Sequence, residues 1–218
     1  MTIDDKYTYP DSDGVLVNRF GIVDAVELDR VLNSYATVEW AELSLAAPPP
    51  VFDFAYLRSI HQRLFRQVLP FAGQIRDVDA QAVGAGVPYC RPAYIATAAD
   101  HLFTTLATAN YLQGLSRPEF AEQLAEHWGE LTAIHPFRDG NTRSQSAYIS
   151  MLCAAAGHPI VWSGIDVDTL RTLRLRAVTT SCDDLAYYLL EQIGDAAVAP
   201  RLIFTSQPDS PTDPGRGR

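Results

Sequence analysis

The sequence contains few cysteines and fewer basic than acidic residues. Its three cysteines, Cys90, Cys153 and Cys182, are an odd number without metal-ligand spacing, so neither a disulfide framework nor a zinc site is indicated. Seventeen Lys and Arg residues stand against 26 Asp and Glu, a net charge of −9. This balance disfavours binding of duplex DNA or an anionic membrane by bulk electrostatics. We therefore expect no direct nucleic-acid partner.

Long apolar runs are also absent. No stretch approaches the roughly 18 apolar residues of a membrane span, and we expect no membrane partner. The opening residues, MTIDDKYTYPDSDG, are acidic and polar, which is the opposite of a secretory signal peptide. We also find no internal repeat. These absences favour a cytoplasmic location and leave the activity open.

The residues that are present indicate a folded, mainly helical protein. Apolar residues make up 47% and charged residues 20% of the 218 positions, which is typical of one sizeable domain or two small ones. Capping residues followed by apolar residues at helical spacing predict the helices. They run between Asp24 and Pro48, between Asp53 and Pro70, from Pro92 to Gly114, from Ser116 to Ile134, from Thr142 to Ala156, and near 166–178 and 183–193.

Residues 73–91 and the C-terminal end break this helical pattern. The first stretch holds three glycines and a proline between short β-like pieces, and it predicts a β-hairpin or exposed flap. The last residues are polar and rich in Pro and Gly, which predicts a disordered tail. The expected fold is all-α with a small β-hairpin flap. We divide it into an N-terminal lead-in and helix (1–50), a catalytic domain (51–195) and the tail (196–218).

Residues 135–146, HPFRDGNTRSQS, interrupt the helices and carry the chemistry. Pro136 favours an extended backbone at the preceding His135. Gly140 allows a tight turn, and Asn141 is suited to cap the helix that follows. A glycine turn into a helix N-terminus presents unpaired N–H groups and the positive end of the dipole, so it predicts an anion site. Arg143, in the first turn, can add charge-assisted hydrogen bonds to a phosphate.

Two further side chains complete this arrangement. Asp139 lies in the same turn, where a carboxylate beside bound phosphates is a natural magnesium ligand. His135 is the titratable group near neutral pH and is suited to act as a general base. Phe137 is expected to point inward and anchor the loop. A base, a magnesium carboxylate and a phosphate site so close together favour transfer of a phosphorus-containing group from a nucleotide to a hydroxyl.

The segment closely resembles the signature of the Fic family, H-x-F-x-[DE]-G-N-G-R-x-x-R. The stretches FDFAYLRSIHQRLFRQVLPFAGQIRDVD (52–79) and PYCRPAYI (88–95) are similar to the family's flanks of the flap. The resemblance covers roughly 15–195 and implies a helical fold with a β-hairpin flap. It also implies transfer of AMP from ATP to a Tyr, Thr or Ser hydroxyl of a target protein, with pyrophosphate leaving.

The resemblance also implies a role for each motif residue. His135 would deprotonate the target hydroxyl, and Asp139 would hold Mg²⁺ between the α- and β-phosphates of the ATP co-substrate. Asn141 and the backbone of Gly140, Asn141 and Thr142 would hold the α-phosphate, and Arg143 would meet the β-phosphate. The flap residues Val87, Pro88 and Tyr89 would bind an extended target segment by β-augmentation.

Two positions depart from the family pattern. Thr142 replaces the usual glycine and adds a side chain that could crowd a phosphate or hydrogen-bond to it, and Ser146 replaces the final arginine. In relatives, that arginine meets the γ-phosphate and an inhibitory glutamate. The family's inhibitory pattern, [ST]-x-x-x-E-[GN], is absent from this sequence. Regulation of that type would therefore need a separate small antitoxin protein, as in stand-alone toxin-like members whose targets include DNA gyrase and topoisomerase IV.

Several interpretations remain open at this point. The transferred group could be phosphate, UMP or phosphocholine, or the two departures could mark a degenerate domain that binds nucleotide or protein without turnover. Arg171, Arg174 and Arg176 are typical of a solvated helix face. Alternatively, Arg171 or Arg174 reaches the terminal phosphate and compensates for Ser146. Finally, three histidines in helical patterns are expected to be packed or surface residues; they are His61, His101 and His127.

Overall fold

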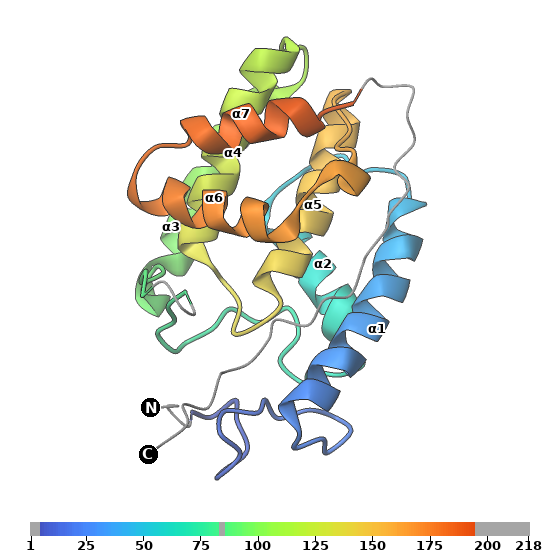
Figure 1. The fold of residues 1–218 in the computed structure, drawn as a ribbon, viewed down its shortest axis with the longest axis vertical. Coiled ribbons are helices and arrows are strands. Elements are labelled where there is room, and N and C mark those ends of the chain that lie inside the picture. The colour runs from blue at the N-terminus through green and yellow to red at the C-terminus, as the bar shows by residue number, and fades with distance from the viewer. Residues whose placement is uncertain (1–4, 83–85, 195–218) are drawn as a thin grey trace, which may run out of the picture.

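The computed structural model describes residues 5–82 and 86–194, and the predicted tail (196–218) lies outside this part of the chain. The described residues form seven α-helices and two short 3₁₀ helices, which confirms a mainly helical fold (Figure 1). The helices are α1 (Ala25–Ser44), α2 (Phe54–Phe65), α3 (Pro92–Thr108), α4 (Arg117–Ile134), α5 (Asn141–Ala156), α6 (Val167–Thr179) and α7 (Asp183–Gln192).

Most helix starts lie where the capping residues predicted them. Asp24 and Asp53 each accept a hydrogen bond from the backbone N–H three residues on, at 2.7 Å. Ser116 and Glu119 form a capping box at the start of α4. The predicted end of α3 at Gly114 is wrong, because the helix ends at Thr108. A short left-handed turn of three positive-φ residues follows at Asn110–Leu112.

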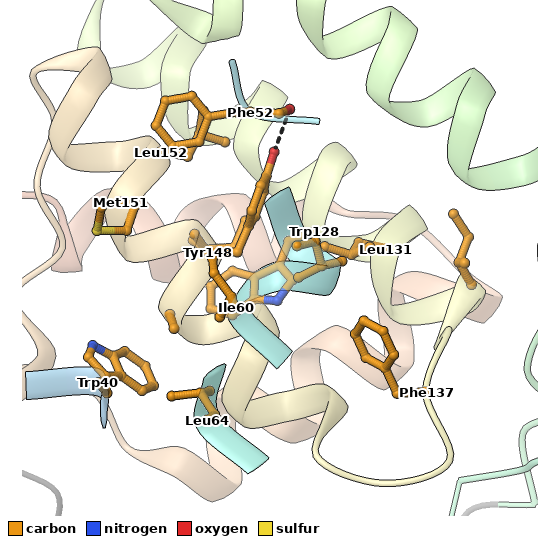
Figure 2. Close-up of a cluster of buried hydrophobic side chains, with 14 of the residues drawn as sticks. Trp40, Phe52, Ile60, Leu64, Trp128, Leu131, Phe137, Tyr148, Met151 and Leu152 are labelled. Carbon is orange, nitrogen blue, oxygen red and sulfur yellow. Dashed lines mark hydrogen bonds between the residues drawn. The ribbon is translucent and has the colours of Figure 1, made fainter. Parts of the chain in front are cut away.

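The core surrounds α4 and α5. Helix α4 packs against α3, α6 and α7, and α5 packs against α2. Trp128 of α4 and Tyr148 of α5 are completely buried, and the Tyr148 hydroxyl donates to the Phe52 carbonyl at 3.1 Å (Figure 2). Phe137 is also fully buried, as predicted, and it ties the α4–α5 loop to this core.

Helix α1 lies against α2 and α5. It buries Leu28, Leu32 and Trp40. Val26 and Val38 match a helical apolar pattern equally well, but they are about 60% exposed. The position of α1 brings polar side chains from its middle turns to the N-terminal end of α5.

The predicted β-hairpin is reduced to a narrow antiparallel pairing in the described residues. Gln81 and Pro88 form one bridge. The N–H of Ala82 donates to the Val87 carbonyl at 2.8 Å, and the N–H of Tyr89 donates to the Ala80 carbonyl at 3.0 Å. Residues 83–85 lie outside the described part of the chain. After this pairing the chain passes the end of α4, where the N–H of Cys90 donates to the Ala133 carbonyl at 2.8 Å.

Candidate active site

His135 ends α4 in a left-handed conformation, with φ 44° and ψ 63°. The extended backbone that Pro136 predicted for this residue is therefore wrong. The His135 N–H still donates to the Leu131 carbonyl at 3.2 Å, so His135 closes the last turn of α4 as an αL residue typically does at a helix end. The steric preference of a residue before proline is overridden because the flanking carbonyls are held by tertiary hydrogen bonds.

Arg76, which follows α2 and precedes the flap, supplies those hydrogen bonds. Its backbone N–H donates to the Pro136 carbonyl at 2.9 Å, and its Nε donates to the His135 carbonyl at 2.8 Å. The guanidinium also donates to the carbonyls of Cys90 and Ile134. Arg76 is 1% exposed. Sequence reasoning missed this role, because nothing in the pattern of residues 73–79 shows what a buried arginine there would bind.

Asn141 closes the loop from its other end. Its Oδ1 accepts from the Phe137 N–H at 2.9 Å, and its Nδ2 donates to the Phe137 carbonyl at 2.7 Å. The prediction that Asn141 caps α5 is wrong, because Asn141 is the first helical residue and Gly140 is the cap. Gly140 has φ 74°, and an added Cβ would lie 2.4 Å from the Phe65 ring, so a glycine is needed there.

His61 of α2 holds the backbone of Asp139. Its Nδ1 accepts from the Gly73 N–H at 2.8 Å, so the imidazole is neutral and its Nε2 donates to the Asp139 carbonyl, 2.9 Å away. The ring also stacks on Phe137, with centroids 3.9 Å apart. Burial lowers the pKa of His61 to about 4. His61 is thus packed, as predicted, and it also fixes the turn that carries the candidate magnesium ligand.

Asp139 and Arg143 lie together at the start of α5. Arg143 Nη2 and Asp139 Oδ2 are 3.0 Å apart, and both side chains are partly exposed. The Thr142 residue that replaces the usual glycine is exposed, whereas Ser146 is buried. The first N–H groups of a helix have no intrahelical partner, so this end of α5 can receive an anion. A carboxylate and a guanidinium then lie at its rim.

The flap residue Tyr89 covers His135. The two rings are parallel within 5°, and their centroids are 3.7 Å apart. Burial, and after it the positive charges of Arg174 and Arg76, lower the pKa of His135 to about 3. His135 is therefore neutral near pH 7, which is the state a general base requires, but the expectation that it titrates near neutral pH is wrong, because the site withholds from the imidazolium the solvation that a free histidine has. Of the other predicted flap residues, Val87 is half-buried and Pro88 is exposed.

Arg174 of α6 lies beside this site and is only 3% exposed. Its Nε donates to the Thr132 hydroxyl at 3.0 Å, its Nη2 donates to the Gln145 amide oxygen, and its guanidinium lies over the Trp128 ring. The interpretation of a solvated face is therefore wrong for Arg174. It holds for Arg176, which is exposed and pairs with Asp184 at 3.0 Å.

Residues 135–146 contain two arginines and one acid, a positive sum, but the structure places acids against both arginines. Arg138 pairs with Asp5 at 2.9 Å, and Arg143 pairs with Asp139, so the two arginines of the segment are matched by acids. The hydrogen bonds of Arg76 and Arg174 go instead to neutral acceptors. Positive potential around His135 therefore comes from arginines outside the segment.

The metal-binding capacity of the site is small. Among the described residues, no group of three or more His, Cys, Asp or Glu side chains could hold a metal ion. Asp139 alone offers a partly exposed carboxylate. This donor set fits Mg²⁺ bound through one carboxylate, nucleotide phosphates and water, and it does not fit a cage built from protein ligands alone.

Comparison with known proteins places the chain in a family. The Fic/DOC family model matches residues 51–153. A protein of Escherichia coli named "Probable protein adenylyltransferase Fic" is 32% identical over 162 residues, which cover 74% of this chain and 78% of that protein. The chain belongs to the Fic/DOC family.

A second relative and a solved structure agree with this assignment. "Protein adenylyltransferase VbhT" of Bartonella schoenbuchensis is 34% identical over 162 residues, 74% of this chain but only 33% of VbhT. The crystal structure of the BepC protein of Bartonella tribocorum with bound AMPPNP superposes with a TM-score of 0.81 at 29% identity. It covers 87% of this chain and 96% of that one. Within the described residues, no helix is long and apolar enough to cross a membrane.

Proposed function

We propose that the protein is a protein adenylyltransferase that transfers AMP from Mg-ATP to a Tyr, Thr or Ser hydroxyl of a target protein. The observation that carries the proposal is the α4–α5 loop, in which a neutral His135 lies close to a helix N-terminus flanked by Asp139 and Arg143. The AMPPNP bound to the similar BepC structure supports ATP as the nucleotide.

In the proposed reaction the imidazole of His135 takes the proton of the target hydroxyl, and the hydroxyl oxygen attacks the α-phosphorus. The bond from that phosphorus to the bridging oxygen breaks, and pyrophosphate leaves. The N–H groups at Gly140, Asn141 and Thr142 hold the α-phosphate, and Arg143 holds the β-phosphate. Asp139 would hold Mg²⁺, which would supply neutralisation of the phosphate charge.

The Asn141 side chain has a different task from that implied by the family motif. Both of its polar groups bind the Phe137 backbone, so it shapes the anion site and contributes its N–H. The segment Val87–Tyr89 receives the target chain in this proposal. Tyr89 covers one face of the His135 ring, and the target hydroxyl approaches along the ring edge, because the lone pair of a basic imidazole nitrogen lies in the ring plane.

Arg174 is the candidate to replace the arginine missing at Ser146. It bonds Gln145, the neighbour of Ser146, and its positive charge is buried against neutral groups. Replacing Arg174 with methionine is expected to raise KM for ATP about tenfold if this cation acts on the phosphates. Arg176→Met, at an exposed position of the same helix, is the matched control. An unchanged KM in the Arg174 variant would remove this idea.

The proposed function is tested with isotopically labelled ATP. Lysate proteins incubated with the protein and Mg-ATP should acquire label from the α-phosphate and not from the γ-phosphate. Label from the γ-phosphate would indicate phosphate transfer, and labelled UTP or CDP-choline tests the UMP and phosphocholine alternatives. If no donor labels any protein, including the enzyme itself, the degenerate binding domain becomes the better interpretation. Mass spectrometry then identifies the modified residue.

The biological setting is also part of the proposal. The resemblance to toxin-like Fic members, whose targets include DNA gyrase and topoisomerase IV, makes these enzymes the first targets that we propose to assay. If the protein is regulated as its toxin-like relatives are, a separate small antitoxin would supply the inhibitory motif that this sequence does not contain. Gyrase supercoiling that survives incubation with the protein and Mg-ATP would exclude that target without excluding AMP transfer to another protein.

A further inference from the structure

The side chain of Arg143 contacts two residues of α1, a helix that precedes the part of the chain matched by the family model. Its Nη1 donates to the Oδ1 of Asn33 at 2.8 Å. The same nitrogen lies 3.7 Å from a carboxylate oxygen of Asp29. On the other edge Nη2 meets Asp139, and below the guanidinium lies the ring of Phe65, 5.0 Å from Cζ. The group is thus fixed on three sides.

The orientation of the Asn33 amide is itself determined. Its Nδ2 donates to the Asp29 carboxylate at 2.8 Å, one helical turn earlier. A carboxylate accepts hydrogen bonds and does not donate them. The amide nitrogen therefore faces Asp29, and the amide oxygen must face Arg143. Asp29 thus orients the Asn33 amide, whose oxygen is the acceptor for the guanidinium.

Asn33 gives direction, not charge, to the surroundings of Arg143. Its amide oxygen accepts a hydrogen bond from a guanidinium that already meets two carboxylates, Asp139 at 3.0 Å and Asp29 at 3.7 Å, and a hydrogen bond depends on orientation more strongly than an ion pair at 3.7 Å does. Arg143 carries five N–H donors in a fixed plane, so two occupied edges leave donors for a phosphate. Without Asn33 the outer half of the arginine side chain keeps its ion pairs with Asp139 and Asp29 and its contact with the Phe65 ring, but it loses its shortest hydrogen bond to α1, and its rotamers become more varied.

We propose that Asn33 is a positioning residue that holds Arg143, with Asp29 orienting its amide, for the phosphates of the nucleotide. The inference rests on the proposed function for the identity of the anion. It makes α1 a working part of the active site, although it contributes no group that touches the reacting atoms. The alternative is that Asn33 merely attaches α1 to α5.

A double-mutant cycle separates these two roles. Asn33→Leu is expected to weaken binding of Mg-AMPPNP, measured by calorimetry, about tenfold in the full chain. In an Arg143→Ala background the same change should alter the affinity less than about twofold, because its effect passes through Arg143. Asp29→Ala should give a smaller loss. Ser34→Ala, an exposed neighbour on α1, is the control. Equal losses in both backgrounds would overturn the inference.

A second measurement needs no nucleotide. The Nε–Hε resonance of Arg143, assigned by its disappearance in Arg143→Ala, should shift and broaden in Asn33→Leu when followed by ¹⁵N NMR. An unchanged resonance would show that Asn33 does not hold the guanidinium and would overturn the inference by itself. Failure of the wild-type protein to bind Mg-AMPPNP would instead overturn the proposed function, while the NMR comparison would still decide whether Asn33 controls Arg143.

Discussion

Alanine in place of His135 is expected to lower the rate of AMP transfer by about 10²–10⁴-fold, the usual contribution of a positioned general base. The affinity for Mg-AMPPNP should stay within about twofold, because the phosphates are proposed to bind at the start of α5 and not at the imidazole. The rate is measured as incorporation of α-phosphate label into target or into the protein itself. Retained transfer in this variant would exclude His135 as the base.

The backbone at His135 requires a second variant. A non-glycine residue at φ 44° is strained, and alanine lacks the short polar side chain that makes asparagine more tolerant of this region. His135→Asn should therefore fold at least as well as His135→Ala while lacking a proton acceptor of suitable basicity. His101→Ala, at an exposed position on α3, is the matched control. Loss of transfer in both His135 variants, with unchanged melting of each, would assign the effect to the imidazole.

The helices were predictable because their signals are local. Asp24, Asp53 and the Ser116–Glu119 pair each mark a helix start within one turn of sequence, and each cap is present in the structure. The α4–α5 loop was predictable as an anion site for the same reason. Its glycine, its helix start and its charged side chains are contiguous, and Phe137 is buried as expected.

The supports of that loop were not predictable, since they come from distant parts of the chain. Arg76 and His61 act through backbone carbonyls of residues 59 and 78 positions later. A carbonyl has no sequence signature, so such pairs leave no pattern to read. For Arg174 the basic run of Arg171, Arg174 and Arg176 favours a solvated helix face, with contact to the terminal phosphate as the alternative. The burial of Arg174 against Trp128 and Gln145 depends on how α6 crosses α4 and α5.

Local rules also failed where two of them competed. At His135 the preference of a residue before proline for an extended backbone is outweighed by the αL conformation that ends α4 and by the hydrogen bonds from Arg76. Asn141 is suited to cap α5, but its side chain forms two hydrogen bonds with the Phe137 backbone instead, and Gly140 takes the cap position. The proposed division at residues 50 and 195 stays a prediction, and the contacts of α1 with Arg143 argue that the first segment belongs to the working site.

Two buried histidines predict strong acid sensitivity of the fold. His61 and His127 are 1% and 5% exposed, and burial lowers the pKa of each to about 4. An unfolded histidine has a pKa of about 6.5. Between these values the unfolded state binds protons that the folded state does not, so stability is fully present above about pH 6.5 and is lost as the pH falls toward 4.

The size of this effect follows from the linkage relation. Each histidine lowers the free energy of unfolding by about 1.4 kcal/mol per pH unit in this window, or about 2 kcal/mol at pH 5. The two together should lower Tm by about 10 °C between pH 7.5 and pH 5, and His135, whose pKa lies at about 3, adds a similar share of about 5 °C, measured by thermal denaturation. His127→Leu should remove about a third of this dependence, because Nε2 of His127 is buried without a hydrogen-bond partner among the described residues and leucine needs none. His61→Leu should be destabilised at every pH, since it frees the Asp139 carbonyl and the Gly73 N–H. Equal Tm values at the two pH values would show that these imidazoles are not kept neutral by burial, and would weaken the case for a neutral His135 as well.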